Sequence, residues 1–291
     1  MTSDRPIILD GGMSNALEDR GHDLSDALWS ARLLRDAPAE IAAVHRAYYE
    51  AGATVATTAS YQASVPGFER HGVERAEAER LIRDSVRIAR EVRDSLPGGR
   101  RLVAASVGPY GAMLADGSEY RGRYGVPPAV LRDFHGPRLE LLIEAGPDLL
   151  AVETIPDTDE AAVLADLLTE LAFPAWFSYS IAGSQTRAGQ PLEEAFATAD
   201  LEQVVAVGIN CCAPEDVQPA VETAVAVTGK PAIAYPNSGE TWDAGGRRWT
   251  GAATDTTSLA TTWLTAGATY IGGCCRVGPD DIHALAQSLN A

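Results

Sequence analysis

The strongest constraint on the fold is a pattern that recurs along the whole chain: a short apolar run rich in β-branched residues alternates with segments of helical periodicity. The eight runs are 6–10 (PIILD), 54–60 (TVATTAS), 101–108 (RLVAASVG), 148–154 (DLLAVET), 174–181 (PAWFSYSI), 204–211 (VVAVGINC), 231–237 (PAIAYPN) and 269–275 (TYIGGCC). Continuously apolar runs are typical of strands that are covered on both faces in parallel sheets. Eight such units predict an α/β fold, a single-domain (β/α)8 or TIM barrel spanning residues 1–291.

Helical segments are predicted at 39–52, 74–96, 128–146, 157–171, 215–229, 254–267 and 279–290. Asp157 and Thr158 supply an N-terminal cap for the fourth of these, and Pro279 suits the first turn of the last. Gly136 and Pro137 lie inside the third, so we expect that helix to be kinked or divided in two. An open doubly wound sheet is the alternative fold, and the lack of a GxGxxG motif after the first run disfavours it.

The composition excludes several classes of protein. The chain has 23 basic and 40 acidic residues, a net charge of −17, which argues against binding to nucleic acid or to an anionic membrane. No apolar run approaches the ~18 residues of a membrane span, and the first residues lack the apolar core of a signal peptide. We therefore expect a cytoplasmic protein. In that compartment the four cysteines are expected to be thiols, metal ligands or catalytic groups rather than a disulfide framework.

Three of the four cysteines close the sixth and eighth runs, at Cys211, Cys274 and Cys275. The active site of a (β/α)8 barrel lies where strands end, and neighbouring strands are ~4.8 Å apart, so these side chains can converge. Three thiolates around one point favour zinc, with a fourth position left open as in catalytic sites.

Adjacent residues of a regular strand point to opposite faces, so Cys274 and Cys275 can share a metal only if the backbone turns. Gly272 and Gly273, just before them, permit that departure. Cys212 is expected to point away from the site and to serve in packing.

Other interpretations remain open at this stage. A buried cysteine is most often a small hydrophobic residue. A zinc hydrolase of the barrel type would use His and carboxylate ligands, but none of the five histidines (22, 45, 71, 135 and 283) closes a strand. A non-catalytic thiol- or metal-binding barrel is disfavoured by the open fourth position and by the long loop at 108–125.

The chain resembles the homocysteine S-methyltransferases, and most closely those that use S-methylmethionine or S-adenosylmethionine; the betaine–homocysteine enzymes are related. The resemblance is carried by 9–21 (LDGGMSNALEDRG), 28–34 (LWSARLL), 57–68 (TTASYQASVPGF), 106–125 (SVGPYGAMLADGSEYRGRYG), 153–161 (ETIPDTDEA), 208–211 (GINC), 235–240 (YPNSGE) and 271–282 (IGGCCRVGPDDI). Asn15 and Ala16 depart from the Thr-Glu or similar pair of many relatives.

The resemblance implies a zinc-dependent barrel that methylates the thiol of L-homocysteine to give methionine. By position it implies these site residues: Cys211, Cys274 and Cys275 as zinc ligands; Asp10, with N–H groups near Gly11, Gly12 and Met13, in the homocysteine site; Glu153 at the homocysteine amine; and Trp29 and Tyr61 near the methyl donor. Zinc would hold homocysteine as a thiolate, which attacks the methyl carbon of the donor.

The segments SYQASVPGF and YPNSGE favour a sulfonium donor, held by aromatic faces, over betaine. A selenol acceptor is the alternative to homocysteine. Asn210 and Asn237 are expected to orient loops or substrate. Arg121 and Arg123 are candidates for pairing with Glu153 or with a substrate carboxylate. The oligomeric state is not defined by the sequence.

Overall fold

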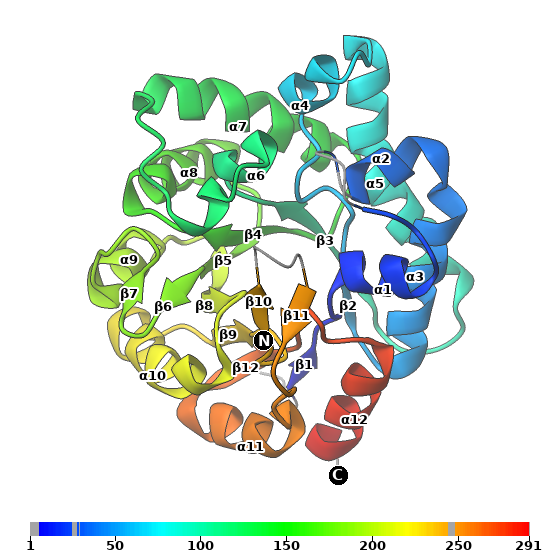
Figure 1. The fold of residues 1–291 in the computed structure, drawn as a ribbon. Helices are drawn as coiled ribbons and strands as arrows, with labels where there is room; N and C mark the ends of the chain where they lie inside the picture. The colour runs from blue at the N-terminus through cyan, green and yellow to red at the C-terminus, as the bar shows by residue number, and fades with distance from the viewer. Residues whose placement is uncertain (1–5, 25–27, 29, 244–247, 291) are drawn as a thin grey trace.

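Eight parallel strands form the centre of the structure, a computed structural model that describes residues 6–24, 28, 30–243 and 248–290 (Figure 1). In hydrogen-bonded order they are β1 (Ile7–Ile8), β12 (Ala268–Ile271), β9 (Ala232–Tyr235), β8 (Val204–Asn210), β5 (Ala175–Tyr179), β4 (Leu149–Ile155), β3 (Leu102–Val107) and β2 (Val55–Thr57). A parallel bridge between Leu9 and Val55 joins the two ends of this order. The predicted (β/α)8 barrel is confirmed, with one strand in each of the eight apolar runs.

The strands are surrounded by helices, and all seven predicted helices are present (Figure 1). They are α3 (Pro38–Ala51), α5 (Arg75–Ser95), α7 (Pro128–Glu144), α8 (Thr158–Leu171), α10 (Val217–Thr228), α11 (Thr256–Ala266) and α12 (Pro279–Asn290). Shorter helices that the sequence analysis did not predict are α1 (Met13–Asp19), α2 (Ser30–Asp36), α4 (Val65–Arg70), α6 (Tyr110–Leu114) and α9 (Leu192–Thr198), with single 3-10 turns η1 (Ser118–Tyr120) and η2 (Pro214–Asp216).

Helix α7 is not divided, although Pro137 lies inside it. Proline in a helix interior costs about 3 kcal/mol because it removes one hydrogen bond and crowds the preceding turn. Leu139 and Leu142, just after the proline, are fully buried, and Arg138 is 2% exposed. Burial of two leucines contributes about 3–6 kcal/mol, which offsets the cost of the proline.

Apolar side chains fill the inside of the barrel and leave its carboxyl end to polar residues. The interior cluster consists of Leu9, Val55, Ala104, Leu149, Ala151, Trp176, Ala206, Ile233 and Tyr235. Trp176 is completely buried and is the largest of them. Because this interior cluster fills the middle of the barrel, the cavity of the barrel opens at the end where the strands finish.

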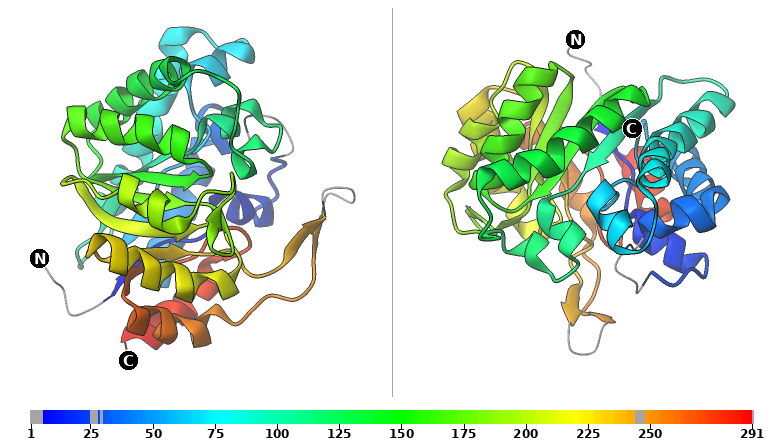
Figure 2. Two further views of the ribbon diagram at one scale, coloured as in Figure 1. Left: turned by 90° about the vertical axis from the view of Figure 1, so that its left-hand side faces the viewer. Right: turned by 90° about the horizontal axis from the view of Figure 1, so that it is seen from above.

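Two antiparallel hairpins interrupt the strand–helix alternation. The hairpin of β6 (Ile181–Ala182) and β7 (Gln185–Thr186) follows β5, and that of β10 (Thr241–Asp243) and β11 (Arg248–Thr250) follows β9. The second hairpin projects away from the barrel (Figure 2). No helix in the described part of the chain is long and apolar enough to span a membrane.

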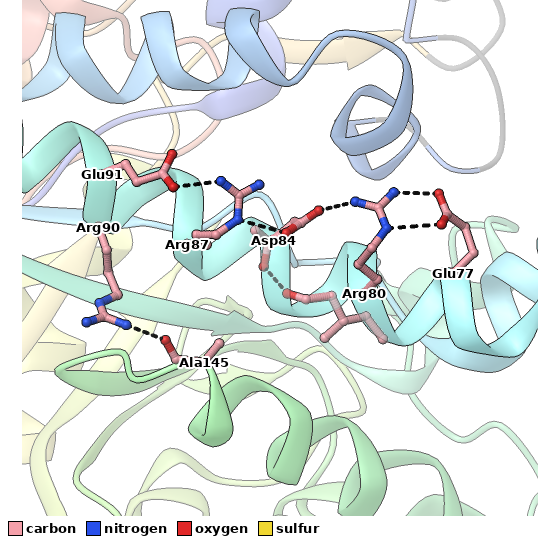
Figure 3. Close-up of polar contacts among 9 residues, drawn as sticks. Glu77, Arg80, Asp84, Arg87, Arg90, Glu91 and Ala145 are labelled. Carbon is pink, nitrogen blue, oxygen red and sulfur yellow. Dashed lines mark hydrogen bonds and ion pairs between the residues drawn. The ribbon is translucent and has the colours of Figure 1, made fainter.

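The exposed face of α5 carries a row of alternating charges (Figure 3). Arg80 pairs with Glu77 at 2.6 Å and also with Asp84. Arg87 pairs with Asp84 at 2.9 Å and with Glu91 at 2.7 Å. Single exposed ion pairs contribute little to stability, but Asp84 joins two arginines and its side chain is only 13% exposed. The ion pairs of Asp84, at the centre of this row, are therefore the ones expected to contribute to the stability of the protein.

We predict that Asp84→Asn lowers the free energy of unfolding by about 1 kcal/mol, because it removes both of these ion pairs at a largely buried position. Glu91→Gln is the control, since the Glu91 side chain is 62% exposed and pairs with Arg87 alone. Its effect should stay within about 0.5 kcal/mol. Urea unfolding of the two variants measures the difference, and equal stabilities would contradict the assignment.

Candidate active site

A cavity opens at the carboxyl end of the barrel and collects the predicted site residues. It is lined by Asp10, Gly11, Gly12, Met13, Tyr61, Glu153, Cys211, Cys274 and Cys275, together with Asn210. Of the predicted site residues only Trp29 is not placed there, because it lies outside the described residues. Ser106, Thr154, Tyr235 and Tyr120 also line the cavity, and the sequence analysis did not identify them as site residues.

The sulfur atoms of Cys211, Cys274 and Cys275 lie within 4.8 Å of one another. Strand β12 ends at Ile271, so the two adjacent cysteines lie beyond the regular strand, as expected. The preceding glycines allow close packing: a Cβ on Gly273 would lie 2.1 Å from a methyl group of Val277. The backbone departure predicted from these glycines is confirmed.

Cys211 and Cys274 are joined by a disulfide, with Cα atoms 5.6 Å apart. The ends of β8 and β12 bring these two sulfurs into contact. The expectation that the cysteines are thiols, metal ligands or catalytic groups rather than a disulfide framework stays a prediction, because this one pair lies within the three-cysteine cluster. Cys275 and Cys212 are free thiols. Burial raises the pKa of Cys275 to about 11. Cys212 is fully buried and is not part of the cluster, in agreement with the packing role expected for it.

Asp10 follows β1 and is held by the end of β2. Its carboxylate accepts hydrogen bonds from the Thr57 N–H at 2.6 Å and from the Thr57 hydroxyl at 2.9 Å. Burial is the main cause that raises the pKa of Asp10 to about 7, and the charge of Glu153 adds to it, whereas the bonds from Thr57 oppose it. The N–H of Gly12 donates to the Val277 carbonyl at 2.9 Å. Of the backbone donors predicted near Asp10, that of Gly12 is therefore already bonded within the protein.

Glu153 lies in β4, and both of its oxygens accept hydrogen bonds from hydroxyl groups. Ser106 donates to one, and Tyr235 donates to the other at 3.1 Å. Burial raises the pKa of Glu153 to about 7, although these hydrogen bonds and the charge of Arg138 lower it. No ion pair forms at Glu153 in the described structure.

The two arginines proposed as partners of Glu153 lie elsewhere. Arg121 and Arg123 are both exposed. Arg123 pairs with the buried carboxylate of Asp157 at 3.7 Å, and its N–H donates to the same carboxylate at 2.8 Å. Asp157 thereby anchors the loop 108–125, and the structure shows no pairing of either arginine with Glu153.

Asn210 connects Glu153 to the cysteine cluster. Its side-chain oxygen accepts hydrogen bonds from the N–H of Thr154 at 2.7 Å and from Ser178 at 2.8 Å, and its NH₂ group donates to the Thr154 hydroxyl at 2.7 Å. Thr154 and Cys211 both have positive φ, at 60° and 48°. Residues other than glycine rarely adopt a positive φ unless neighbouring contacts impose it. Asn210 thus fixes the residue after Glu153 and immediately precedes a proposed metal ligand.

Two other asparagines hold the loop that carries Cys275. The side chain of Asn237 accepts a hydrogen bond from the Cys275 N–H at 3.1 Å. The side chain of Asn15 accepts one from the Arg276 N–H at 2.6 Å. Asn15, where the sequence departs from many relatives, therefore supports the loop after the cysteine pair, and Asn237 orients a loop as expected.

Three tyrosines line the cavity, namely Tyr61, Tyr120 and Tyr235. Tyr61 packs against Gly108, where a Cβ would lie 2.6 Å from its ring. The buried guanidinium of Arg138 fixes this corner by donating to the carbonyls of Tyr61 at 2.6 Å and Gly108 at 2.9 Å. Tyr120 comes from η1 in the loop 108–125. The only sequence signal for it was the Gly- and Tyr-rich composition of that loop.

The fold and site together define a (β/α)8 barrel with three clustered cysteines and two buried carboxylates at its catalytic end. Comparisons with known proteins agree. The family model for homocysteine S-methyltransferase matches residues 7–289. The chain is 46% identical to the homocysteine S-methyltransferase of Escherichia coli (96% of this chain, 94% of the relative) and 43% identical to a selenocysteine Se-methyltransferase of Brassica oleracea (97% and 88%).

Solved structures give the same result. The metallated form of the Escherichia coli homocysteine methyltransferase superposes with a TM-score of 0.88 at 43% identity, covering 97% of this chain and 96% of that one. The chain therefore belongs to the homocysteine S-methyltransferase family and is a methyltransferase.

We predict that the protein becomes less stable as pH rises past neutrality, in part because of Glu153. Its folded-state pKa of about 7 lies above the ordinary value of 4.5, so the folded state favours the protonated acid. The stability this gives is complete below the unfolded pKa and is lost as pH rises through about 7. Glu153→Gln should remove about 2 kcal/mol of the decline between about pH 5.5 and pH 8, measured by urea unfolding.

Glu240→Gln is the control for this pH effect. Its hydrogen bond with Arg276 lowers the pKa of Glu240, so Glu240 stays ionised throughout the same pH range. The decline in stability of this variant should match that of the unmodified protein. An unchanged decline in Glu153→Gln would show that Glu153 does not titrate there.

We also predict that Asn210→Ala lowers the free energy of unfolding by about 2–4 kcal/mol, because buried groups of Thr154 and Ser178 lose their partner. Asn237→Ala is the matched control: its half-buried side chain accepts one bond, and its loss should cost about 1 kcal/mol. Urea unfolding compares the two, and a smaller effect at Asn210 than at Asn237 would contradict its assigned role.

Proposed function

We propose that the protein transfers a methyl group from a sulfonium donor to the thiol of L-homocysteine, giving methionine, with zinc as its cofactor. The observation that carries the proposal is the placement of three cysteine sulfurs within 4.8 Å of one another in the cavity that also holds Glu153. This placement supports a role for the cysteines in activating a substrate thiol and a role for Glu153 in binding an amino-acid substrate.

The residues present suit a zinc ion. Soft sulfur ligands favour zinc, and three protein ligands are the usual number in catalytic sites. Cys211, Cys274 and Cys275 would hold the ion after reduction of the Cys211–Cys274 disulfide, because the thiolate is the ligand. When bound, zinc supplies a Lewis acid that keeps a coordinating thiol deprotonated near neutral pH. The relative from Escherichia coli has been solved in a metallated form, which supports a metal here.

Glu153 is proposed to bind the ammonium group of homocysteine. It is 7% exposed and accepts hydrogen bonds only from the neutral side chains of Ser106 and Tyr235. A buried carboxylate without a countercharge is unfavourable, and a substrate cation beside it would favour the ionised form. Asp10, which is also buried, adds a second acidic group to the same cavity. The acceptor named for most relatives is homocysteine.

The donor is proposed to be S-methylmethionine or S-adenosylmethionine. The homocysteine sulfur forms a bond to the methyl carbon while the bond from that carbon to the donor sulfur breaks, and the electron pair of the broken bond stays on the donor. The donor thereby loses its positive charge. Carboxylates and the faces of Tyr61 and Tyr120 suit a cation before transfer, and each aromatic contact contributes about 0.5–2 kcal/mol.

A selenol acceptor is the alternative, supported by the 43% identity to a selenocysteine Se-methyltransferase. A selenolate attacks a methyl carbon in the same way. Competition between selenocysteine and homocysteine for one methyl donor decides which acceptor has the higher kcat/KM.

The test is metal content and methyl transfer by the reduced protein, assayed with homocysteine and each donor. We predict one zinc per chain and methionine from a sulfonium donor. Cys275→Ala should lose the metal and at least 10³-fold in methyl transfer, because the ion loses one of three ligands. Cys212→Ala is the matched control: its thiol is fully buried outside the cluster, and this variant should keep both properties. Full activity of Cys275→Ala without metal would overturn the proposal.

A further inference from the structure

The cavity has acidic side chains but no basic side chain among its described residues, so it lacks a group that would bind the carboxylate of an amino-acid donor. Its walls hold the carboxylates of Asp10 and Glu153 and the cysteine cluster, and no arginine or lysine of the described chain lines it. The proposed donors carry a carboxylate at the end of a short carbon chain from the sulfonium. That anion is repelled by the inner wall, so its binding group must lie toward the cavity mouth.

Tyr120 marks this mouth. It lines the cavity and is nevertheless 38% exposed, so its ring extends from the interior to the surface. Tyr120 and Cys275, a proposed metal ligand, line the same cavity. A donor whose methyl group points at that cysteine cluster would extend past Tyr120 toward solvent.

Arg187 lies over the Tyr120 ring, with its guanidinium carbon 6.0 Å from the ring centre. It follows β7, and the hairpin fixes its position: the Arg187 N–H donates to the Ser180 carbonyl at 3.1 Å, and its Nε donates to the Ser180 hydroxyl at 3.3 Å. Ser180 is completely buried. The backbone and the inner part of the side chain are thus held in place.

The outer part of the guanidinium forms no ion pair in the described structure, whereas two other arginines of this rim are paired. Arg123 lies beside Asp157, and Arg276 beside Glu240 at 3.1 Å. A half-buried guanidinium held through Nε keeps its two terminal NH₂ groups free for a carboxylate, which arginine binds through parallel hydrogen bonds.

We propose that Arg187 binds the carboxylate of the methyl donor, across the face of Tyr120 from the cavity. This inference rests on the proposed function, because it takes the donor to be an amino acid with a sulfonium group. It makes Arg187 a specificity-determining residue that favours donors with a carboxylate over simple sulfonium ions. Arg187 contacts no proposed homocysteine ligand, so it should act on the donor alone.

The test compares S-methylmethionine with its carboxamide, which keeps the sulfonium and the ammonium and lacks only the carboxylate charge. Arg187→Gln should raise the KM for S-methylmethionine about 10–100-fold, the usual value of a charge-assisted hydrogen bond, and leave the KM for the carboxamide unchanged. Arg187→Lys keeps the positive charge but lacks the planar guanidinium, so its KM for S-methylmethionine should lie between those of the unmodified protein and Arg187→Gln. The KM for homocysteine and the zinc content should not change in either variant.

Arg123→Gln is the matched control, because Arg123 is an arginine of the same rim whose partner is Asp157; its donor kinetics should equal those of the unmodified protein. An equal loss with both donors, a raised KM for homocysteine, or no change in Arg187→Gln would each overturn the assignment. If the unmodified protein takes no methyl group from either S-methylmethionine or S-adenosylmethionine, the proposed donor fails and the role of Arg187 fails with it. If the unmodified protein and Arg187→Gln both use S-methylmethionine with the same KM, only the role assigned to Arg187 is overturned.

Discussion

The parallel hydrogen bonding of the eight strands is the constraint on which the site depends. Parallel pairing brings every carboxyl end to one rim, so residues as distant in sequence as Asp10, Glu153 and Cys275 line one cavity. The single bridge between Leu9 and Val55 completes the circle, and Asp10 reinforces it through two hydrogen bonds to Thr57 at the same seam. A residue assigned to the substrate site thus also joins the first and second strands of the barrel.

The second constraint on the site is that two acidic side chains, Asp10 and Glu153, are buried in the same cavity. Asp10 and Glu153 each have a pKa raised to about 7, chiefly by burial, and the charge of Glu153 adds to the rise at Asp10. The protein supplies hydroxyl and backbone donors to these carboxylates where a structural site would supply a cation. A site built in this way is less favourable empty than filled by a cationic substrate. The stability lost by burying these two acids would be recovered on binding of the substrate ammonium group and sulfonium donor that we propose.

The sequence predicted the barrel well because each apolar run is long enough to define a strand, and it predicted the cavity because strand ends are easily located. It failed where tertiary contacts decide. Pro137 was expected to kink or divide its helix, and the helix is not divided, because Leu139 and Leu142 are buried beside the proline. Tyr120 and Tyr235 were missed for different reasons: one lies in a loop whose path depends on Asp157, and the other looks like an ordinary apolar strand residue until its hydroxyl meets Glu153.

The strained backbone shows how the two halves of the site are connected. Thr154 in β4 and Cys211 just after β8, with β5 between these strands, have positive φ, and Arg276, directly after Cys275, does as well. Each is held by an asparagine or lies beside one: Asn210 bonds Thr154 and precedes Cys211, and Asn15 bonds Arg276. Such conformations cost about 1–3 kcal/mol each and persist only where the surroundings impose them. The Asn210 side chain holds Thr154, the residue after Glu153, and Asn210 is itself the residue before Cys211. A shift at the acid that would hold the substrate amine is therefore expected to be transmitted through Asn210 to the sulfur cluster.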